Sequence, residues 1–187
     1  MSLQITAQPI AEPVTVAEVK ARLRLSTSAD DSVIASNITT AREYAESVTG
    51  WSFAGKTYRL TRDSFPFPHE AIKLPRPPLV SVTSVKYLDS NYVWQTWDSA
   101  EYFVVEANVP ALIVPKTSFI YPPPVSAPGA VRIDFVAGAQ AHTPHLEGIR
   151  QLAVHIYEHP SVVSSEGLKE IPLAISAFFL GKRVYGF

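Results

Sequence analysis

The chain has 187 residues, with 16 basic and 17 acidic side chains, and 47% of its residues are hydrophobic. This composition can bury a sizeable core and excludes a disordered chain. The absence of cysteine excludes disulfide scaffolds and thiolate metal sites, and a net charge of −1 excludes the basic field of a non-specific nucleic-acid binder.

No apolar run reaches the ~20 residues that a membrane-spanning helix needs. Residues 1–4 show no basic stretch followed by an apolar one, so no signal peptide is visible. We therefore expect no membrane association and synthesis in the cytoplasm.

Two helices are predicted within the first fifty residues. Thr15 and Glu18 have the spacing of a capping box and predict a helix from Val16 to Leu23. The cluster Ser28, Asp30 and Asp31 predicts the start of the second helix, because its side chains can accept hydrogen bonds from free amides. Gly50 predicts its end. One apolar seam runs along this second helix: Ile34, Ile38, Ala41, Ala45 and Val48.

Between residues 57 and 136 the pattern changes to short β-rich runs separated by proline and turn residues. The predicted strands are Thr57 to Phe65, Ile72 to Leu74, Val80 to Leu88, Tyr92 to Trp97, Tyr102 to Val105, Ala111 to Val114 and Val131 to Val136. Residues 89–91 suit a hairpin turn. Because no helix-length connection separates the runs, we expect an antiparallel meander.

Two proline-rich stretches, Pro66 to Pro78 and Pro110 to Pro128, interrupt these strands. The second includes the run Pro122-Pro123-Pro124, which favours an extended surface loop with fixed backbone angles. The alternative is a proline-rich ligand for another domain, because both kinds of segment have the same composition.

Helical periodicity returns at Thr143-Pro144 and ends at Pro160, and a last short helix is predicted from Pro172 to about Leu180. The seam of the longer helix is formed by Leu146, Ile149, Ala153 and Ile156. We therefore predict an α+β fold in a single domain over residues 1–187. N- and C-terminal helices, at about 15–50 and 143–181, pack against each other as a small helical core, and an antiparallel β section at about 56–137 is inserted between them.

The sharpest chemical motif is His155, Glu158 and His159, which has the H-x-x-E-H spacing of inverted zincins. Histidines four residues apart share a helix face and can ligate one zinc ion while the glutamate acts as a base. The alternative is that these three residues form a solvent-facing stripe on the helix. Pro160 favours this alternative, because a proline at this position ends the helix at His159. Glu166 and Glu170 are the acidic residues that follow.

Three other groups have a chemical and a structural interpretation. His142 and His145 flank Thr143-Pro144 and are expected on the surface at the start of a helix rather than on a metal. Asp30 and Asp31 can be metal ligands, but their position at a helix start already accounts for them. Five aromatic residues offer a stacking platform for bases or sugars, or the packing surface of a small sheet: Tyr92, Trp94, Trp97, Tyr102 and Phe103.

The last six residues contain the cations Lys182 and Arg183 and the aromatic residues Tyr185 and Phe187. Arginine and aromatic side chains are typical anchors of protein interfaces, so these four residues are candidates for partner binding. The alternative is a frayed chain end.

Four segments resemble, in order, one family: the head–tail connector, or neck adaptor, proteins of tailed bacteriophages and their prophage and gene-transfer-agent relatives. The segments are EPVTVAEVKARLR at residues 12–24, the DD, AREYAE and TG elements within residues 30–50, KLPRPPLVSVTSVKY at residues 73–87, and AVRIDFVAG at residues 130–138. The chain departs from the family pattern at Tyr121-Pro122, where relatives tend to have Trp-Pro.

The resemblance implies a structural virion protein without catalysis or cofactor. Such proteins form a ring, typically a dodecamer, under the portal protein, where they extend the DNA exit channel and dock head-completion or tail-terminator proteins. DNA passes through the ring without sequence-specific contacts. The protein is then expected in the virion neck, and in the bacterial cytoplasm before assembly. In relatives the C-terminal segment reaches the portal, which implies a portal anchor at Lys182, Arg183, Tyr185 and Phe187.

Two other functions are left open: a metal-dependent hydrolase that uses His155, Glu158 and His159, and another non-enzymatic tail or neck component, such as a tail terminator or baseplate adaptor. A ring subunit needs two different, complementary faces, because a head-to-tail contact closes only at the right rotation between neighbours. We therefore expect weak or concentration-dependent association of the isolated protein.

Overall fold

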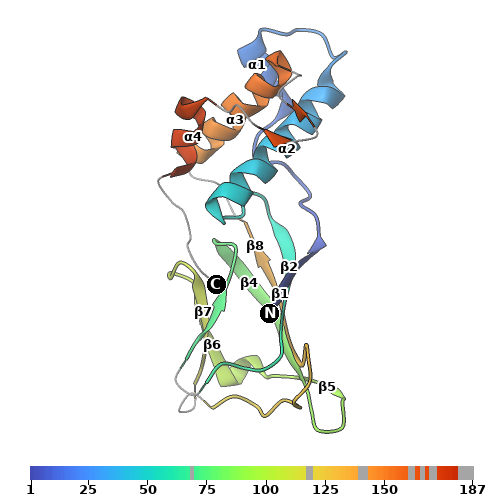
Figure 1. The fold of residues 1–187 in the computed structure, drawn as a ribbon, viewed down its shortest axis with the longest axis vertical. Helices are drawn as coiled ribbons and strands as arrows, with labels where there is room; N and C mark the ends of the chain where they lie inside the picture. Colours follow the sequence, from blue (N-terminus) through green and yellow to red (C-terminus); the bar gives the residue numbers. More distant parts are fainter. Residues whose placement is uncertain are drawn as a thin grey trace. The chain divides into compact units, whose positions relative to one another are not determined.

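A computed structural model describes residues 1–67, 70–116, 120–138, 143–159, 163–164, 167–168 and 172–180. These residues form two compact units, a β unit of residues 1–10 and 55–138 and a helical unit of residues 11–54 and 143–180. Four helices and mainly antiparallel strands confirm the α+β class (Figure 1).

The helical unit contains α1 (Val16–Leu23), α2 (Asp31–Thr49), α3 (Thr143–Glu158) and α4 (Leu173–Leu180). The predicted capping box is present at α1, where the backbone amide of Glu18 donates to Thr15 and the Glu18 carboxylate accepts from the backbone of Thr15. Gly50 ends α2 with a φ of 75°, and its amide donates to the carbonyl of Glu46. The helix limits were therefore readable from local signals.

The two predicted seams meet in one core. Ile34, Ile38, Ala41 and Ala45 of α2 are fully buried together with Ile149, Ala153 and Ile156 of α3. Val48 and Leu146 are only partly buried at the margin of this core. Leu152 of α3 and Phe179 of α4 complete it. The central expectation, that an early and a late helix seam close over each other, is confirmed.

The β unit consists of two sheets whose strands correspond closely to the predicted runs. The first has the order β1-β2-β8-β4-β5, and the second has the order β3-β7-β6. The strand limits are β1 Ser2–Ala7, β2 Lys56–Arg62, β3 Ile72–Leu74, β4 Leu79–Leu88, β5 Trp94–Thr96, β6 Tyr102–Val105, β7 Ala111–Pro115 and β8 Val131–Ala137; a short 3-10 helix, η1, spans Ser99–Glu101. Buried residues of both sheets form one apolar cluster, so the sheets pack face to face.

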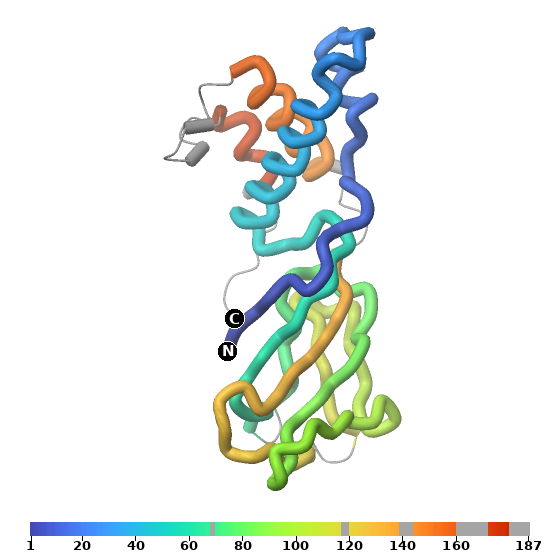
Figure 2. The backbone as a smooth tube through the Cα atoms, turned by 90° about the vertical axis from the view of Figure 1, so that its right-hand side faces the viewer, coloured from blue at the N-terminus to red at the C-terminus, as the bar shows by residue number. Residues whose placement is uncertain are grey.

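The predicted meander is wrong, although all pairings within these sheets are antiparallel. Strand β8 lies between β2 and β4, as Figure 2 shows where the orange strand runs between the cyan and green ones. Val131, Ile133 and Phe135 of β8 are all fully buried, and a central position gives this strand a hydrogen-bonded neighbour on both sides. A meander would have placed it at an edge.

Three strands were not predicted: β1, β9 and β10. Ser2–Ala7 forms β1, which pairs with β2 from Ser2 opposite Thr61 to Ala7 opposite Thr57. Within the polar stretch at residues 161–170, β9 (Val163–Ser164) and β10 (Gly167–Leu168) form a short antiparallel pair. Neither segment has an alternation long enough to stand out in the sequence.

Candidate interaction site

The candidate site lies in the β unit, where the proline-rich segment meets an aromatic cluster. Trp97 follows β5 and is 3% exposed, and Tyr102 begins β6 and is also buried. Phe65 contacts Trp97 edge-on, with ring centroids 5.7 Å apart. Tyr121 stacks on Phe65 at 5.0 Å with the ring planes 14° apart. The Tyr121 hydroxyl donates a 2.6 Å hydrogen bond to the carbonyl of Glu70, so the segment is held at this point.

Within the stretch from Pro110 to Pro128, the strand predicted at Ala111 to Val114 is present as β7. The expectation of a surface loop is corrected at Tyr121, which packs into the aromatic cluster. Desolvation by burial raises the pKa of Tyr121 to about 12. The cause of the misprediction is that a tyrosine among prolines carries no local signal of burial.

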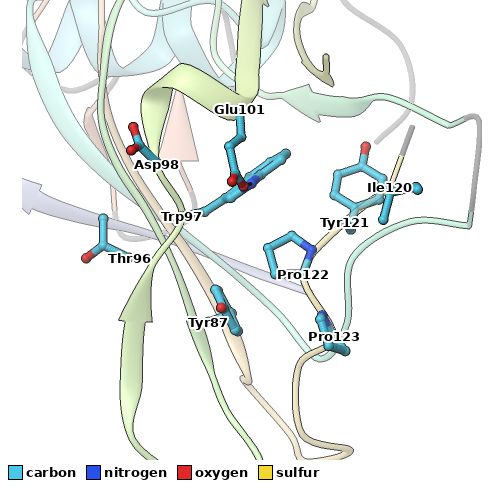
Figure 3. A pocket seen from close by; sticks show the side chains of 9 residues that line it. All are labelled: Tyr87, Thr96, Trp97, Asp98, Glu101, Ile120, Tyr121, Pro122 and Pro123. Atoms are coloured by element: carbon cyan, nitrogen blue, oxygen red, sulfur yellow. Dashed lines mark hydrogen bonds between the residues drawn. The ribbon is translucent and has the colours of Figure 1, made fainter. Parts of the chain in front are cut away.

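A groove of about 530 Å³ opens beside this cluster (Figure 3). In Figure 3, Trp97 and Glu101 lie on one side of the groove and Tyr121 and Pro122 on the other. The lining residues are Tyr87, Thr96, Trp97, Asp98, Glu101, Ile120, Tyr121, Pro122 and Pro123. The walls are thus aromatic and proline-rich.

Two carboxylates and no basic side chain line this groove. Glu101 accepts a 2.8 Å hydrogen bond from the indole nitrogen of Trp97, and Asp98 accepts one of 2.8 Å from the amide of Ala100 at the start of η1. The carboxylates therefore have structural partners, and the lining contains no histidine, lysine or cysteine that could serve as a base or nucleophile. Chemically the groove can bind an apolar or cationic protein segment.

The five aromatic residues proposed as a stacking platform do not form one surface. Trp97 and Tyr102 are buried in the core of the β unit, whereas Tyr92 and Phe103 are exposed. Trp94 stacks against the guanidinium of Arg132, whose central carbon lies 4.1 Å from the ring centroid. The interpretation as the packing surface of a sheet therefore applies to Trp97 and Tyr102.

The H-x-x-E-H motif lies on the last turns of α3 and the residue after it. The rings of His155 and His159 have centroids 4.8 Å apart, and Glu158 and His159 are exposed. His155 is half-buried beside a hollow of about 440 Å³, and its Nε2 atom has no hydrogen-bond partner. In the part of the chain that the structure describes, no three metal-ligating side chains come together. Glu166 and Glu170 lie outside the described residues, and the hydrolase alternative is left without support.

His145 corrects the expectation of a surface residue. It is 4% exposed and lies against Phe53 and Trp51, with ring centroids 5.1 and 6.4 Å away. These aromatic residues follow α2, about ninety residues earlier in the chain, so nothing near His145 in sequence indicates its burial. His142 lies outside the described residues.

Asp30 and Asp31 stand at the start of α2 as predicted, but their side chains do not cap the helix. Asp30 accepts a 2.8 Å hydrogen bond from the hydroxyl of Tyr157 on α3, and this bond raises the pKa of Tyr157. Asp31 forms a 2.6 Å ion pair with Lys20 of α1. Asp30 therefore connects the start of α2 to α3, and Asp31 connects it to α1.

Sequence reasoning missed a buried ion-pair network around Arg42 of α2. Its side chain is 2% exposed and donates to Glu12 at 2.7 Å and to Glu46 at 2.9 Å. Glu12 also accepts from Thr39, and Glu46 accepts from the amide of Phe53. The four-residue spacing of Arg42 and Glu46 indicates an ion pair on one helix face and could have been read from the sequence. Glu12, the third partner, lies thirty residues before Arg42, and no local pattern indicates its contact.

This network gives a physical reason for the first two resemblance segments. Glu12 begins the first segment, and Arg42 and Glu46 belong to the second. The network joins the two segments, because Glu12 lies on the approach to α1 and Arg42 of α2 supplies the buried charge that binds it. The proposed anchor residues Lys182, Arg183, Tyr185 and Phe187 lie outside the described residues. Within the described residues, no helix has the length and apolar character needed to cross a membrane.

Residues 13–88 match the model of a protein family described as phage gp6-like head-tail connector protein. The match covers α1, α2 and strands β2 to β4, including the capping box, Arg42 and Glu46. The matched segment spans less than half of the chain.

Solved structures from gene transfer agent particles share the fold of the whole chain. A chain of the virion of a native gene transfer agent particle has a TM-score of 0.79 at 21% identity, covering 100% of this chain and 97% of that one. The neck of an empty particle of that kind, computed with C6 symmetry, gives the same values. The neck of a native particle, computed with C12 symmetry, has a TM-score of 0.77 at 20% identity with the same coverage. No curated protein sequence matches the chain.

Proposed function

We propose that this connector protein forms a ring under the portal of a tailed phage, prophage or gene-transfer-agent particle, extends the DNA exit channel and docks head-completion or tail proteins. The observation that carries the proposal is the family match over residues 13–88 on a chain whose whole fold is that of neck components. A twelve-membered ring is supported by the C12 symmetry of one such neck. In this proposal the two units act together as one connector domain in the virion neck, after synthesis in the bacterial cytoplasm.

The described side chains agree with a mechanical rather than a catalytic role. Both carboxylates of the groove in the β unit already accept hydrogen bonds from neighbouring residues, and the His155 motif lacks a third ligand among the described residues. Buried ion pairs and a cap tie the helical unit together. We therefore propose that the protein is not an enzyme and needs no cofactor.

The test is assembly with the portal protein of the same particle. Purified portal rings are mixed with the connector protein, separated by sedimentation and imaged in negative stain. We expect the connector to co-sediment as an added ring. A connector that stays in the supernatant, or that forms a tight closed dimer by light scattering, would count against the proposal.

Elemental analysis tests the hydrolase alternative. Zinc in stoichiometric amount, lost on substitution of His155 and His159 by alanine, would favour the hydrolase over the connector.

A further inference from the structure

The larger sheet of the β unit has two edges whose backbone groups face outward. Its order is β1-β2-β8-β4-β5, so among the described residues β1 has a neighbour on one side only. On the opposite side β5 covers only Lys86–Leu88 of β4, which leaves residues 79–84 of β4 at the edge. We call β1 the first edge, and β5 with residues 79–84 the second edge. Unpaired backbone amides and carbonyls of this kind are templates for another chain.

Both edges lack charged side chains, one of the usual protections of an exposed strand, although β5 has only 3 residues and register shifts interrupt β1 and residues 79–84 of β4. Charged side chains, proline and very short strands are the usual devices. No charged residue occurs between Met1 and Ala11, nor in residues 79–84 or 94–96. Five of the six residues of β1 are exposed. The edges of the smaller sheet differ, because β3 contains exposed Lys73 and β6 is flanked by Glu101 and Glu106.

Exposed apolar side chains accompany both edges of the larger sheet. Ile5 of β1 is 47% exposed and Met1 before it is 61% exposed. At the second edge, Val80 is 45% and Val93 is 53% exposed. Apolar side chains at the rim of a sheet gain free energy when a further strand covers them. Both edges therefore have the backbone and the side chains of a strand-pairing interface.

We propose that the first edge of one copy pairs with the second edge of the next copy, so that the larger sheet continues from subunit to subunit around the ring. The inference rests on the proposed ring function and names the surface that builds the ring. Two different edges make a head-to-tail contact, which closes a ring, whereas β1 paired with β1 would make a twofold dimer. Four successive antiparallel pairings make β1 and β5 run in the same direction. The small rotation between neighbours in a ring cannot reverse a strand, so β1 of the next copy runs parallel to β5 and antiparallel to residues 79–84 of β4.

Thiol crosslinking tests this arrangement cleanly, because the chain contains no cysteine. Ile5→Cys is combined in turn with Val80→Cys, Thr83→Cys and Val93→Cys, and portal-bound rings are treated with a short bismaleimide, which tolerates differences in register. We expect at least one pair to give a ladder of covalent oligomers, and each single variant to give none. A dimer from Ile5→Cys alone, or rings in which none of the three pairs crosslinks, would overturn the proposal.

Edge charges give a second, independent measurement. Gln4→Lys with Ile5→Lys places two cations on the first edge, and the matched control, Thr57→Lys with Thr61→Lys, adds the same charge on β2, which is paired on both sides. We expect the edge variant to lower ring formation about tenfold or more while the control assembles nearly as the wild type. Unchanged circular dichroism establishes that both fold.

The outcomes separate this inference from the proposed function. If the wild type forms no ring on the portal, the proposed function fails whatever the variants do. If the wild type and the edge variant form rings equally well, only the edge pairing is wrong.

Discussion

Arg42 is among the largest fully buried side chains of the protein, and its charge is balanced by Glu12 and Glu46. A buried ion pair of this kind contributes little net stability compared with apolar packing, but removal of one partner leaves the other charge buried and uncompensated. The network therefore makes the position intolerant of substitution and connects the segment before α1 to α2.

Replacement of Arg42 by methionine is expected to lower the free energy of unfolding by about 3–5 kcal/mol, because the Glu46 carboxylate is then left buried without its cation. Urea denaturation followed by circular dichroism measures the change. The matched control is Arg22→Met, which removes an exposed pair with Glu147 and is expected to cost at most about 1 kcal/mol. Equal effects of the two substitutions would contradict the role assigned to Arg42.

Tyr121 gives the protein a predicted alkaline dependence of stability. Burial raises its pKa from 10.0 to about 12, so between these values the unfolded chain loses a proton that the folded chain keeps. The folded state binds more protons in this range, and the free energy of unfolding therefore falls as the pH rises from about 10 towards 12. Denaturation series at several alkaline pH values measure the slope.

The control for this prediction is Tyr121→Phe, which retains the ring and removes the titrating hydroxyl. Its stability is expected to depend less steeply on pH in the same range, and at neutral pH it loses the bond to the Glu70 carbonyl at a cost of about 1 kcal/mol. Tyr102, whose pKa is raised by burial, and Tyr157, whose pKa is raised by its hydrogen bond to Asp30, contribute to the slope that is left. An identical slope in the variant would show that Tyr121 does not titrate in this way.

Among the elements, the contact between α3 and α4 depends on one small residue. Gly148 lies in the middle of α3, and a Cβ atom there would lie 2.8 Å from the Cβ of Phe178 and 2.8 Å from the ring of Phe179. The Cβ of Phe178 belongs to the rigid part of α4 and cannot move aside without moving the helix. Glycine has a low helix propensity, but the close packing of α3 against α4 requires it at position 148.

Gly148→Ala is therefore expected to destabilise the protein, although in an open helix the same change stabilises. Overpacking costs about 1–3 kcal/mol, more than the ~1 kcal/mol that alanine gains over glycine in a helix. Thermal and urea denaturation measure the result. Phe179→Leu added to Gly148→Ala is expected to be less destabilising than the sum of the single changes, because it removes one of the two clashes. A stabilised Gly148→Ala variant would refute the close contact.

At the scale of whole elements, the positions of strands β2 to β8 were predicted to within three residues, but their order in the sheets was not. The alternation of buried and exposed positions in Val131–Ala137 identifies a strand with one face in a core. It cannot show that β8 pairs with β2 on one side and β4 on the other. Strand order depends on which apolar faces fit together in space, and this information is spread over more than seventy residues.

For the whole molecule, the C-terminal residues Lys182 to Phe187 provide the last prediction. Deletion of these six residues is expected to leave folding intact and to weaken binding to portal rings, because the resemblance to connector proteins gives this segment the role of a portal anchor. Circular dichroism monitors the fold and co-sedimentation monitors the binding. Unchanged co-sedimentation would remove the portal-anchor proposal while leaving the ring proposal in place.

The sequence by itself determined the four helices, seven of the eight strands in the two larger sheets, the capping box and the turn at Gly50. It also determined that two apolar seams meet. Each of these features depends on periodicity or on residues at most a few positions apart. Only the tertiary structure decided the burial of His145, the partial burial of Tyr121, the Arg42 network, the central place of β8 and the two exposed edges of the larger sheet. Each of these depends on partners far apart in the chain, and a local pattern records what a residue prefers but not which distant surface it meets.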